Sequence, residues 1–381
     1  MLILTNDDVA KVLTIEGAIE ALRISNREIY DFRIKEHKNE FRLDRPRTNC
    51  YLPWKADQAK EDQSFPGVNE DTRILYNFKS MEGGSLHFGM WAVRSSSDLV
   101  RFNSNSNSYG PSQTYLRYGD LPGGKGYSDL VFLYNTFDAQ FEAIIHAAAL
   151  QGIRVAATSA LGVDYLCRTD VTKLGLFGSG WQAAANLRAL LHVRPSIDQV
   201  VVFSPNFEHC SQFAVKQSAA LGIQIIPARQ PEQAVLDMDI ICEATSSTNA
   251  VFDGDLLKPG QHIVSIGAGD NVYRRRPIDP KAVARCDKIV VHTLDVRLGL
   301  DEIEDCVAAQ KLNWDSIVDL PELIGTDRRE KANDNQITFF KNNVGLGTQF
   351  AAVGGLVLAQ AKKQGLGFTV PQELVSQVMS R

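Results

Sequence analysis

A glycine-rich turn between an apolar run and an alanine-rich segment is the stretch of this sequence best suited to chemistry. Residues 174–177 are apolar and lead into Gly178, Ser179 and Gly180, with Ala183 three residues later. Glycines at this spacing let the backbone approach a pyrophosphate, whose charge is stabilised at the N-terminus of the following helix. The pattern predicts a nicotinamide dinucleotide site, although strand-to-helix turns without a ligand use the same glycines.

Strand and helix patterns alternate after this turn. A helix is predicted to about residue 192, then a strand over 199–204 and a helix over 213–221. Further strands are predicted over 224–227, 240–244, 262–266 and 288–292. They are short and rich in β-branched residues, as is typical of strands buried on both faces. The alternation predicts an α/β fold with a Rossmann-type, doubly wound parallel sheet.

The regions on either side of this alternation predict a second domain. A helix capped by Thr5 and a helix over residues 14–32 open the chain. Residues 36–126 are polar and irregular, but strand patterns at 87–94 and 129–134 favour a mixed or antiparallel sheet with long functional loops. An apolar helix is predicted over 349–362. We expect residues 1–153, completed by 342–381, to form an α+β domain beside a dinucleotide-binding domain of residues 154–341.

Composition narrows the class of protein. The 381 residues carry a formal net charge of -5, which argues against a nucleic-acid partner. No stretch approaches the roughly 20 apolar residues that span a bilayer, and the N-terminus lacks a signal-peptide pattern. The six cysteines and seven histidines show no metal-ligand spacing, so no metal site is expected. A cytoplasmic enzyme is the expectation.

Several ordered segments make the chain similar to the ornithine cyclodeaminase and mu-crystallin family over nearly its whole length. They are LTNDDVAKVLTIEGAIEAL, PRTNCYLP, IRVAATSALGVDYLCR, LGLFGSGWQA, CEATSS, LLKPGQHIVSIGAGD and ITFFKNNVGLG. The resemblance implies a homodimer in which the N- and C-terminal segments form the substrate and dimerisation domain. It also implies hydride transfer between a nicotinamide and the α-carbon of a small amino or imino acid.

Three arginines lie where the resemblance implies contacts to the substrate carboxylate: Arg47, Arg94 and Arg154. The planar guanidinium matches a carboxylate with two parallel hydrogen bonds. Arg154 is expected just before a helix start rich in alanine, threonine and serine. The family pattern has a lysine near Arg94, and either Arg94 or Trp91 takes its place. As a catalytic residue Arg94 would polarise the substrate but not shuttle protons, which disfavours cyclodeamination.

Asp270 is the candidate for proton transfer. It follows the predicted strand 262–266, at the carboxyl end of the sheet where ligands of such folds bind. Imine reduction needs a proton at nitrogen as hydride reaches carbon, and a positioned carboxylate can supply it. An aspartate beside glycines is also common in turns. The resemblance favours the catalytic role.

The end of the second Rossmann strand bears on the choice of coenzyme. An acidic residue there accepts the ribose hydroxyls of NAD, but Ser204, Pro205 and Asn206 hold none, and Glu208 follows later. This favours NADP(H), with NAD(H) as the alternative. The resemblance implies that Trp181 and Gln182 meet the pyrophosphate through backbone N–H groups. It implies further coenzyme contacts at Ala244, Thr245, Ser246, Gly267, Arg274, Asn343 and Val344.

These observations together predict an NAD(P)-dependent oxidoreductase acting on the C–N bond of an amino or imino acid, as an imine or ketimine reductase or an amino acid dehydrogenase. One alternative is a cyclodeaminase, an ammonia-lyase of a diamino acid that recycles its NAD internally. Another is a mu-crystallin-like protein that binds NADP or another ligand without catalysis. The presence of Asp270 and the three arginines favours an enzyme.

Overall fold

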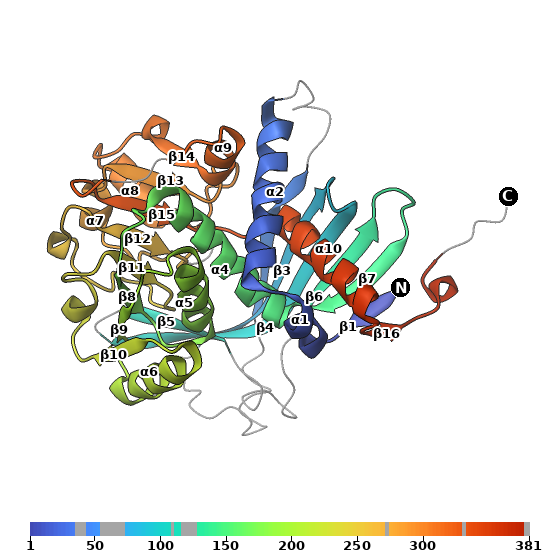
Figure 1. Ribbon diagram of the computed structural model, residues 1–381, viewed down its shortest axis with the longest axis horizontal. Coiled ribbons are helices and arrows are strands. Elements are labelled where there is room, and N and C mark those ends of the chain that lie inside the picture. The colour runs from blue at the N-terminus through green and yellow to red at the C-terminus, as the bar shows by residue number, and fades with distance from the viewer. Residues whose placement is uncertain are drawn as a thin grey trace. The chain divides into compact units, whose positions relative to one another are not determined.

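A computed structural model of the chain describes residues 1–34, 43–53, 73–107, 110–115, 128–270, 274–329 and 333–376 (Figure 1). The chain divides into two compact units. The first comprises Met1–Gly17, Phe32–Gln151 and Gly345–Arg381, and the second comprises Ala18–Asp31 and Gly152–Val344. Much of the polar region predicted over residues 36–126 lies outside the described residues.

The second unit contains an eight-stranded sheet in which every neighbouring pair of strands is parallel. Its order is β10-β9-β8-β11-β12-β15-β13-β14. The strands are β8 (Lys173–Phe177), β9 (Gln199–Phe203), β10 (Gln224–Ala228), β11 (Ile240–Glu243), β12 (His262–Ser265), β13 (Lys288–Val291), β14 (Ile317–Asp319) and β15 (Thr338–Lys341). The predicted Rossmann-type parallel sheet is confirmed.

The helices of the second unit are labelled in Figure 1. They are α2 (Ile15–Ile34), α4 (Ala147–Leu166), α5 (Trp181–Val193), α6 (Phe207–Leu221), α7 (Pro280–Ala284), α8 (Asp301–Ala308) and α9 (Leu320–Gly325). Helix α6 begins six residues earlier than the sequence pattern indicates, because Asn206 caps it by accepting the His209 N–H at 2.9 Å.

Most of α2 belongs to the second unit, although the sequence predicts a domain of residues 1–153. A Cβ added to Gly325 would overlap the Tyr30 ring, and Arg27 donates a 2.6 Å hydrogen bond to the Gly325 carbonyl. Close packing at a glycine therefore ties residues 18–31 to α9.

The first unit contains a mixed sheet with order β16-β1-β7-β6-β4-β3-β2, and β5 pairs with β4. Among the described strands of this first-unit sheet, only β1 and β7 pair in parallel. The elements are β1 (Leu2–Leu4), α1 (Asn6–Val12), β2 (Asp44–Pro53), β3 (Arg73–Ser85), β4 (Met90–Asn107), β5 (Gly110–Tyr115), β6 (Ser128–Asn135), β7 (Phe141–His146), α10 (Gly347–Gln364) and β16 (Phe368–Thr369).

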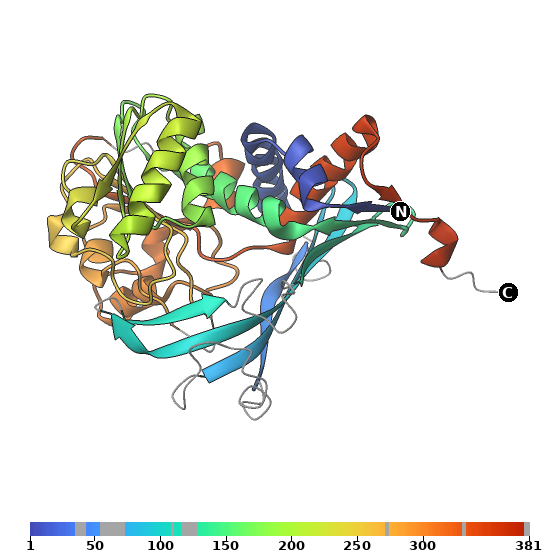
Figure 2. The same ribbon diagram turned by 90° about the horizontal axis from the view of Figure 1, so that it is seen from below.

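Helix α10 covers one face of this sheet, as Figure 2 shows from below. A Cβ on Gly347 would overlap the backbone of Glu82, so the helix start can approach β3 only as glycine. The strand predicted over residues 87–94 starts later than expected, because residues 86–89 form a turn that ends at Gly89 with φ of 62°.

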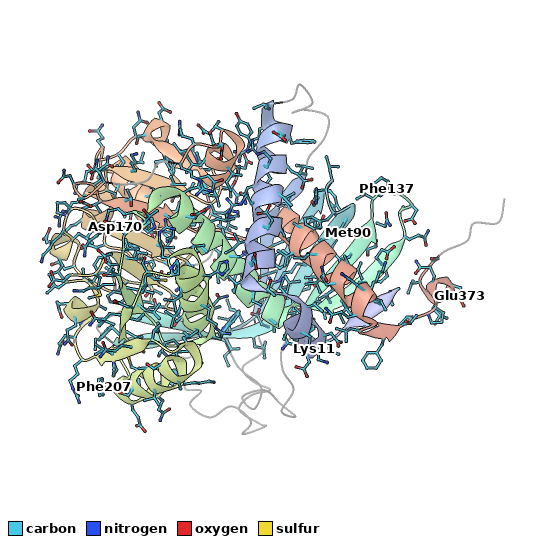
Figure 3. The ribbon with its side chains drawn as sticks, viewed as in Figure 1. Lys11, Met90, Phe137, Asp170, Phe207 and Glu373 are labelled. Atoms are coloured by element: carbon cyan, nitrogen blue, oxygen red, sulfur yellow. The ribbon has the colours of Figure 1, made fainter. Side chains whose placement is uncertain are left out.

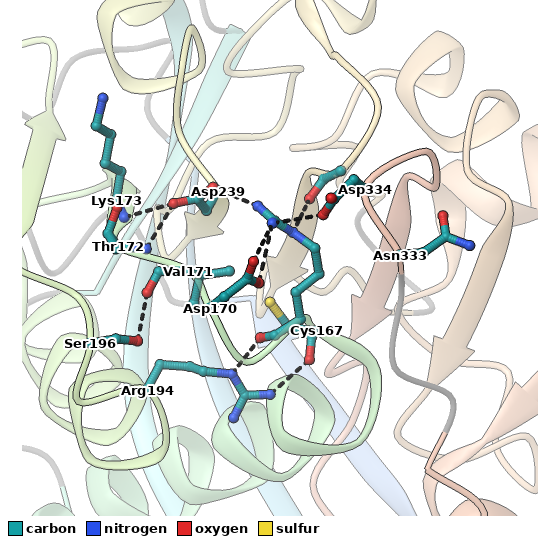
Figure 4. Close-up of polar contacts among 12 residues, drawn as sticks. Cys167, Asp170, Val171, Thr172, Lys173, Arg194, Ser196, Asp239, Asn333 and Asp334 are labelled. Atoms are coloured by element: carbon teal, nitrogen blue, oxygen red, sulfur yellow. Dashed lines mark hydrogen bonds and ion pairs between the residues drawn. The ribbon is translucent and has the colours of Figure 1, made fainter.

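A cluster of ion pairs and hydrogen bonds around Arg168 stabilises the edge of the parallel sheet at which the strands begin (Figure 4). Its guanidinium contacts Asp239 at 2.7 Å and Asp334 at 2.9 Å, and Asp239 accepts the backbone N–H groups of Thr172 and Lys173. Arg194 donates to the carbonyls of Val163, Cys167 and Arg168 at the end of α4. These contacts are structural, since they lie at the edge opposite the glycine-rich turn. Within the described ranges, no helix has the length and apolar character needed to cross a bilayer.

Candidate active site

The glycine-rich turn lies where the strand order of the parallel sheet reverses. Phe177 ends β8 between Phe203 of β9 and Glu243 of β11. Gly178 follows with φ of 107° and donates its N–H to the Phe203 carbonyl at 2.9 Å. A Cβ at Gly178 would overlap the Ala244 carbonyl oxygen. The turn therefore requires glycine, and it opens at the position where α/β sheets of this kind bind their ligands.

The N-terminus of α5 faces open space. Gly180 is its N-cap, makes no side-chain cap, and a Cβ there would meet nothing within 4 Å. The backbone N–H groups of the first turn point into this space. The buried side-chain oxygen of Gln182 has no hydrogen-bond partner among the described residues; because it is an acceptor, only the backbone N–H of this residue suits an anion. Ala183 is fully buried, as the fingerprint predicts. These features fit a pyrophosphate.

Trp181 and Ser179 complete the turn. Trp181 is about half exposed, at 53%, and its ring lies against Gly152, where a Cβ would come within 2.7 Å. The Ser179 hydroxyl and His209 Nδ1 lie 2.8 Å apart. His209 stands in the first turn of α6, so it links the glycine-rich turn to the segment after β9. Sequence patterns do not predict this pair, because the contact joins two separate helix starts.

Three neighbouring strands of the second unit end in a buried row of polar side chains. Glu243, Ser265 and Lys341 end β11, β12 and β15 and are successive register partners. Ser265 Oγ donates to Glu243 at 2.8 Å, and Lys341 Nζ donates to Ser265 Oγ at 3.3 Å. All three side chains are fully buried. A charged residue directly after an apolar strand, as in IICE and TFFK, is the sequence signal that could have revealed the row.

The row holds the loop that leads to Asp270. Glu243 accepts the Gly267 N–H at 3.0 Å, and Lys341 donates to the Gly267 carbonyl at 2.5 Å. Lys341 also forms an ion pair with Glu302 of α8. Burial raises the pKa of Glu302 to about 7, although the Lys341 ammonium opposes this effect. Asp270, half-buried, follows this fixed segment three residues later.

The loop after β11 is fixed by the same carboxylate. Glu243 accepts the Thr245 N–H at 2.8 Å and the Thr245 hydroxyl at 2.7 Å. The Arg275 side chain also stabilises this loop, because it donates hydrogen bonds to the carbonyls of Thr245 and Ser247. Ser246 is exposed between them. The backbone around residues 244–246 is thus presented beside Gly178.

Two predicted coenzyme contacts have other partners in the structure. Arg274, predicted to supply charge to a phosphate, pairs with Asp301 at 2.7 Å and Asp305 at 3.1 Å, because the first turn of α8 is acidic. The Asn343 amide donates to three carbonyls and accepts the Thr293 N–H, so it fastens the loop over residues 293–298. Asn343 and Val344 are buried, which leaves only their backbone for a coenzyme.

The predicted substrate residues are divided between the units. Arg154 is buried in the second unit and lies inside α4 rather than before its start, because α4 begins at Ala147. Thr158 Oγ1 donates to its carbonyl at 3.0 Å. Arg47 belongs to β2 of the first unit, where its Nε donates to Asn49 at 3.0 Å.

Arg94, predicted to contact the substrate, is buried and has a carboxylate partner within the first unit. Its guanidinium binds Asp129 through two hydrogen bonds, at 2.9 and 2.7 Å, and lies 5.8 Å from the Phe350 ring centroid of α10. Asp129 therefore occupies the Nε and Nη2 donors of Arg94, which form one of the two edges that can bind a carboxylate in a two-pronged manner. Trp91 projects from the opposite face, against Gly84.

Further charged side chains share the face of Arg94. Lys79 and Asp98 are buried there 3.8 Å apart, and Asn77 donates to Asp98 at 2.9 Å. They occupy alternate positions of β3 and β4, as residues on one face of a sheet must. Their strands lie in the polar region, in which the sequence predicts a strand over residues 87–94 but not over β3 or the rest of β4.

Comparisons with known proteins agree with this geometry. The model of the ornithine cyclodeaminase/mu-crystallin family matches residues 127–365. A Delta(1)-pyrroline-2-carboxylate reductase of Bacillus cereus is 28% identical over 249 residues, covering 64% of this chain and 74% of the relative. An iminosuccinate reductase of Paracoccus denitrificans is 27% identical over 236 residues, covering 62% and 71%. The first three curated relatives are matched over 66% to 74% of their own lengths.

Among solved structures, the chain is similar to Delta(1)-pyrroline-2-carboxylate reductase of Thermococcus litoralis in complex with NADH and L-proline. The TM-score is 0.74 at 23% identity, and the superposition covers 97% of this chain and 100% of that one. Likeness at this identity establishes the shared fold.

Proposed function

The chain belongs to the ornithine cyclodeaminase/mu-crystallin family, and we propose that it is an NAD(P)-dependent oxidoreductase that reduces the C=N bond of a small imino acid. The reverse reaction would oxidise the matching amino acid. Two relatives carry the names of reductases of cyclic or acyclic imino acids, which supports this substrate class.

The observation that carries the proposal is the turn at Gly178. It has the positive φ and the close approach to Ala244 that only glycine allows, and it opens in front of the uncapped N-terminus of α5. A dinucleotide pyrophosphate would fit the backbone N–H groups there. When bound, the nicotinamide supplies the hydride for reduction.

We assign to Asp270 the role of proton donor to the substrate nitrogen. The loop before it is held at the backbone N–H of Gly267 by Glu243 and at the backbone carbonyl of Gly267 by Lys341. A carboxyl group on a fixed loop at the carboxyl edge can donate a proton to the substrate nitrogen. Its conjugate base would accept that proton in the oxidative direction.

The substrate carboxylate is assigned to Arg47 and Arg154. Arg94 is assigned a positioning role, because Asp129 engages its guanidinium. Arg47 and Arg154 each carry a permanent charge that matches a carboxylate. Arg47 belongs to the first unit and Arg154 to the second.

We further propose a homodimer that uses the face of the first unit's sheet opposite Arg94. Trp91, Phe132 and Tyr134 project there, and the rings of Tyr134 and Phe141 lie 5.0 Å apart. Tyr134 is 38% exposed. Aromatic side chains on an exposed sheet face are typical of protein interfaces.

The test is a screen of cyclic imines, and of 2-oxo acids with ammonia or amines, against NADPH and NADH. Loss of reduced nicotinamide in proportion to the amino acid formed supports the proposal. Ammonia release from a diamino acid without net change in the coenzyme would instead indicate a cyclodeaminase. Coenzyme binding without turnover of any substrate would indicate a binding protein. We expect NADP(H) to be preferred, because residues 204–206 hold no acid.

A further inference from the structure

Arg229 lies beside the end of the second Rossmann strand, although it is distant from that strand in sequence. Strands β9 and β10 are parallel neighbours, and Phe203 and Ala228 are their last register partners. Ser204 and Arg229 therefore leave the sheet side by side, about 5 Å apart along the hydrogen-bonding direction. Residues 204–208 contain no basic side chain, so the sequence alone does not reveal that an arginine lies near this segment.

The Arg229 guanidinium is stacked on an aromatic ring. Its central carbon lies 3.9 Å from the centroid of Phe207, the first residue of α6, which Figure 3 labels. The Arg229 backbone is fixed as well, since its N–H donates to Gln233 at 2.9 Å. Stacking holds the guanidinium by one face and leaves the N–H donors at its edges available to a ligand.

Arg229 differs from Arg168 and Arg274 in its charge partners and resembles Arg297, which is also exposed and lies over the Trp314 ring without a carboxylate partner among the described residues. Arg168 and Arg274 each bind carboxylates, whereas Arg229 is exposed and forms no ion pair with any residue in the described ranges. A stacked, unneutralised guanidinium is suited to a phosphate dianion, which it binds through two parallel hydrogen bonds.

We propose that Arg229, held by Phe207, binds the 2′-phosphate of NADP(H) and determines the preference for this coenzyme. The inference rests on the proposed function. In folds of this kind the adenosine ribose lies at the end of the second strand, where an arginine accommodates the 2′-phosphate. Ser204 directly follows β9 and α6 begins at Phe207, and the N-terminus of a helix favours an anion.

Glu208 is a nearby side chain that would favour the other coenzyme, NAD(H). It is exposed beside Phe207, and its carboxylate accepts a 3.5 Å hydrogen bond from Gln212. A carboxylate at the ribose would accept the hydroxyls of NAD(H) and repel a 2′-phosphate. Arg229 and Glu208 therefore predict opposite coenzyme preferences.

The experiment is an equilibrium titration of the full-length protein with NADPH and with NADH, followed by nicotinamide fluorescence. Displacement of NADPH by 2′,5′-ADP and by 5′-AMP provides a second readout that needs no substrate. We expect the wild type to bind NADPH at least about tenfold more tightly than NADH, and 2′,5′-ADP more tightly than 5′-AMP.

Arg229→Gln removes the charge and keeps most of the side-chain length. It should raise the Kd for NADPH about ten- to a hundredfold and change that for NADH by less than about threefold. Arg229→Lys should lie between wild type and Arg229→Gln. The control is Arg329→Gln, since Arg329 is also exposed and stacked, 4.7 Å from the Tyr165 ring, but follows α9 and pairs with Asp164.

Several outcomes would overturn the inference alone. They are tighter binding of NADH than of NADPH by the wild type, an unchanged NADPH Kd in Arg229→Gln, or equal weakening of both coenzymes, which would make the stacked pair structural. Failure of the wild type to bind either coenzyme would instead refute the proposed function, and the inference with it.

Discussion

The carboxylate of Glu243 accepts the backbone N–H of Gly267 at 3.0 Å. This hydrogen bond joins the end of β11 to the loop after β12, so a fully buried charge fixes the segment that precedes Asp270. Glu243 accepts further hydrogen bonds from Thr245 and Ser265. A buried carboxylate is tolerated when its oxygens are satisfied in this way. The arrangement sets the geometry of two loops that bear predicted site residues.

Replacing Glu243 by glutamine should therefore loosen both loops. The amide would point two N–H donors at groups that are themselves donors, and we expect a loss of about 2–4 kcal/mol in the free energy of unfolding. Urea denaturation measures this change. Glu232→Gln, at an exposed position, serves as the control and should change stability by less than about 0.5 kcal/mol. Equal effects of the two variants would contradict the role of Glu243.

The two glycines of the turn should respond differently to alanine. Gly178→Ala places a methyl group against the Ala244 carbonyl at φ of 107°, and should cost about 3 kcal/mol of stability. Gly180→Ala meets open space and should cost less than about 1 kcal/mol. However, its methyl group would occupy the approach of a pyrophosphate, so the Kd for the coenzyme should rise at least about tenfold. Thermal denaturation and coenzyme titration separate the two effects.

Asp270→Asn should reduce turnover without preventing coenzyme binding. The amide cannot exchange the required proton, so kcat should fall by about two to four orders of magnitude while the Kd for the coenzyme stays within about threefold. Steady-state kinetics on the substrate found in the screen provide the measurement. The exposed Asp198→Asn is the matched control. Turnover of Asp270→Asn at the wild-type rate would remove the assigned proton role.

His262 should make stability depend on pH. Burial, together with the charge of Arg194, lowers its pKa to about 3 from the ordinary value of 6.5. Between pH 6.5 and about 3, His262 is protonated in the unfolded chain but not in the folded protein. The free energy of unfolding therefore decreases as the pH falls below 6.5. At pH 5 this amounts to about 2 kcal/mol. His262→Asn, whose amide lies near the position of Nδ1 and can keep the hydrogen bond to Thr338, should flatten the loss in urea denaturation, and the exposed His192→Asn should not.

A double-mutant cycle measures how strongly the Arg94–Asp129 ion pair stabilises the fold, independently of substrate binding. Asp129→Asn leaves a buried guanidinium without a full charge partner, and should cost about 3–5 kcal/mol. Adding Arg94→Met removes the unpaired charge, so the double variant should be more stable than the sum of the single changes predicts. A coupling of about 2 kcal/mol or more in urea denaturation is expected. If the two stability changes were additive, Arg94 and Asp129 would not be coupled, and a direct contact of Arg94 with the substrate carboxylate would be favoured.

The glycine-rich turn and the order of strands and helices could be predicted from the sequence because each depends on neighbouring residues. Residues 174–183 contain the apolar run, the glycines and the small residue that the turn requires. The α6 start was predicted late, since Asn206 acts as a cap through a side-chain hydrogen bond that hydrophobic periodicity does not detect. The predicted role of Arg274 did not allow for the acidic start of α8.

By itself, the sequence determined the Rossmann-type fold, the family and the turn at Gly178, because hydrophobic periodicity and glycine spacing are local properties of the chain. Only the tertiary structure decided which charges meet. Strand β15 lies between β12 and β13, and β11 lies beside β8, so Lys341 reaches Ser265 and Ala244 reaches Gly178. Arg94 meets Asp129, and Arg229 meets Phe207, for the same reason. A sheet places side chains by strand order and register, and these are fixed by packing over the whole unit.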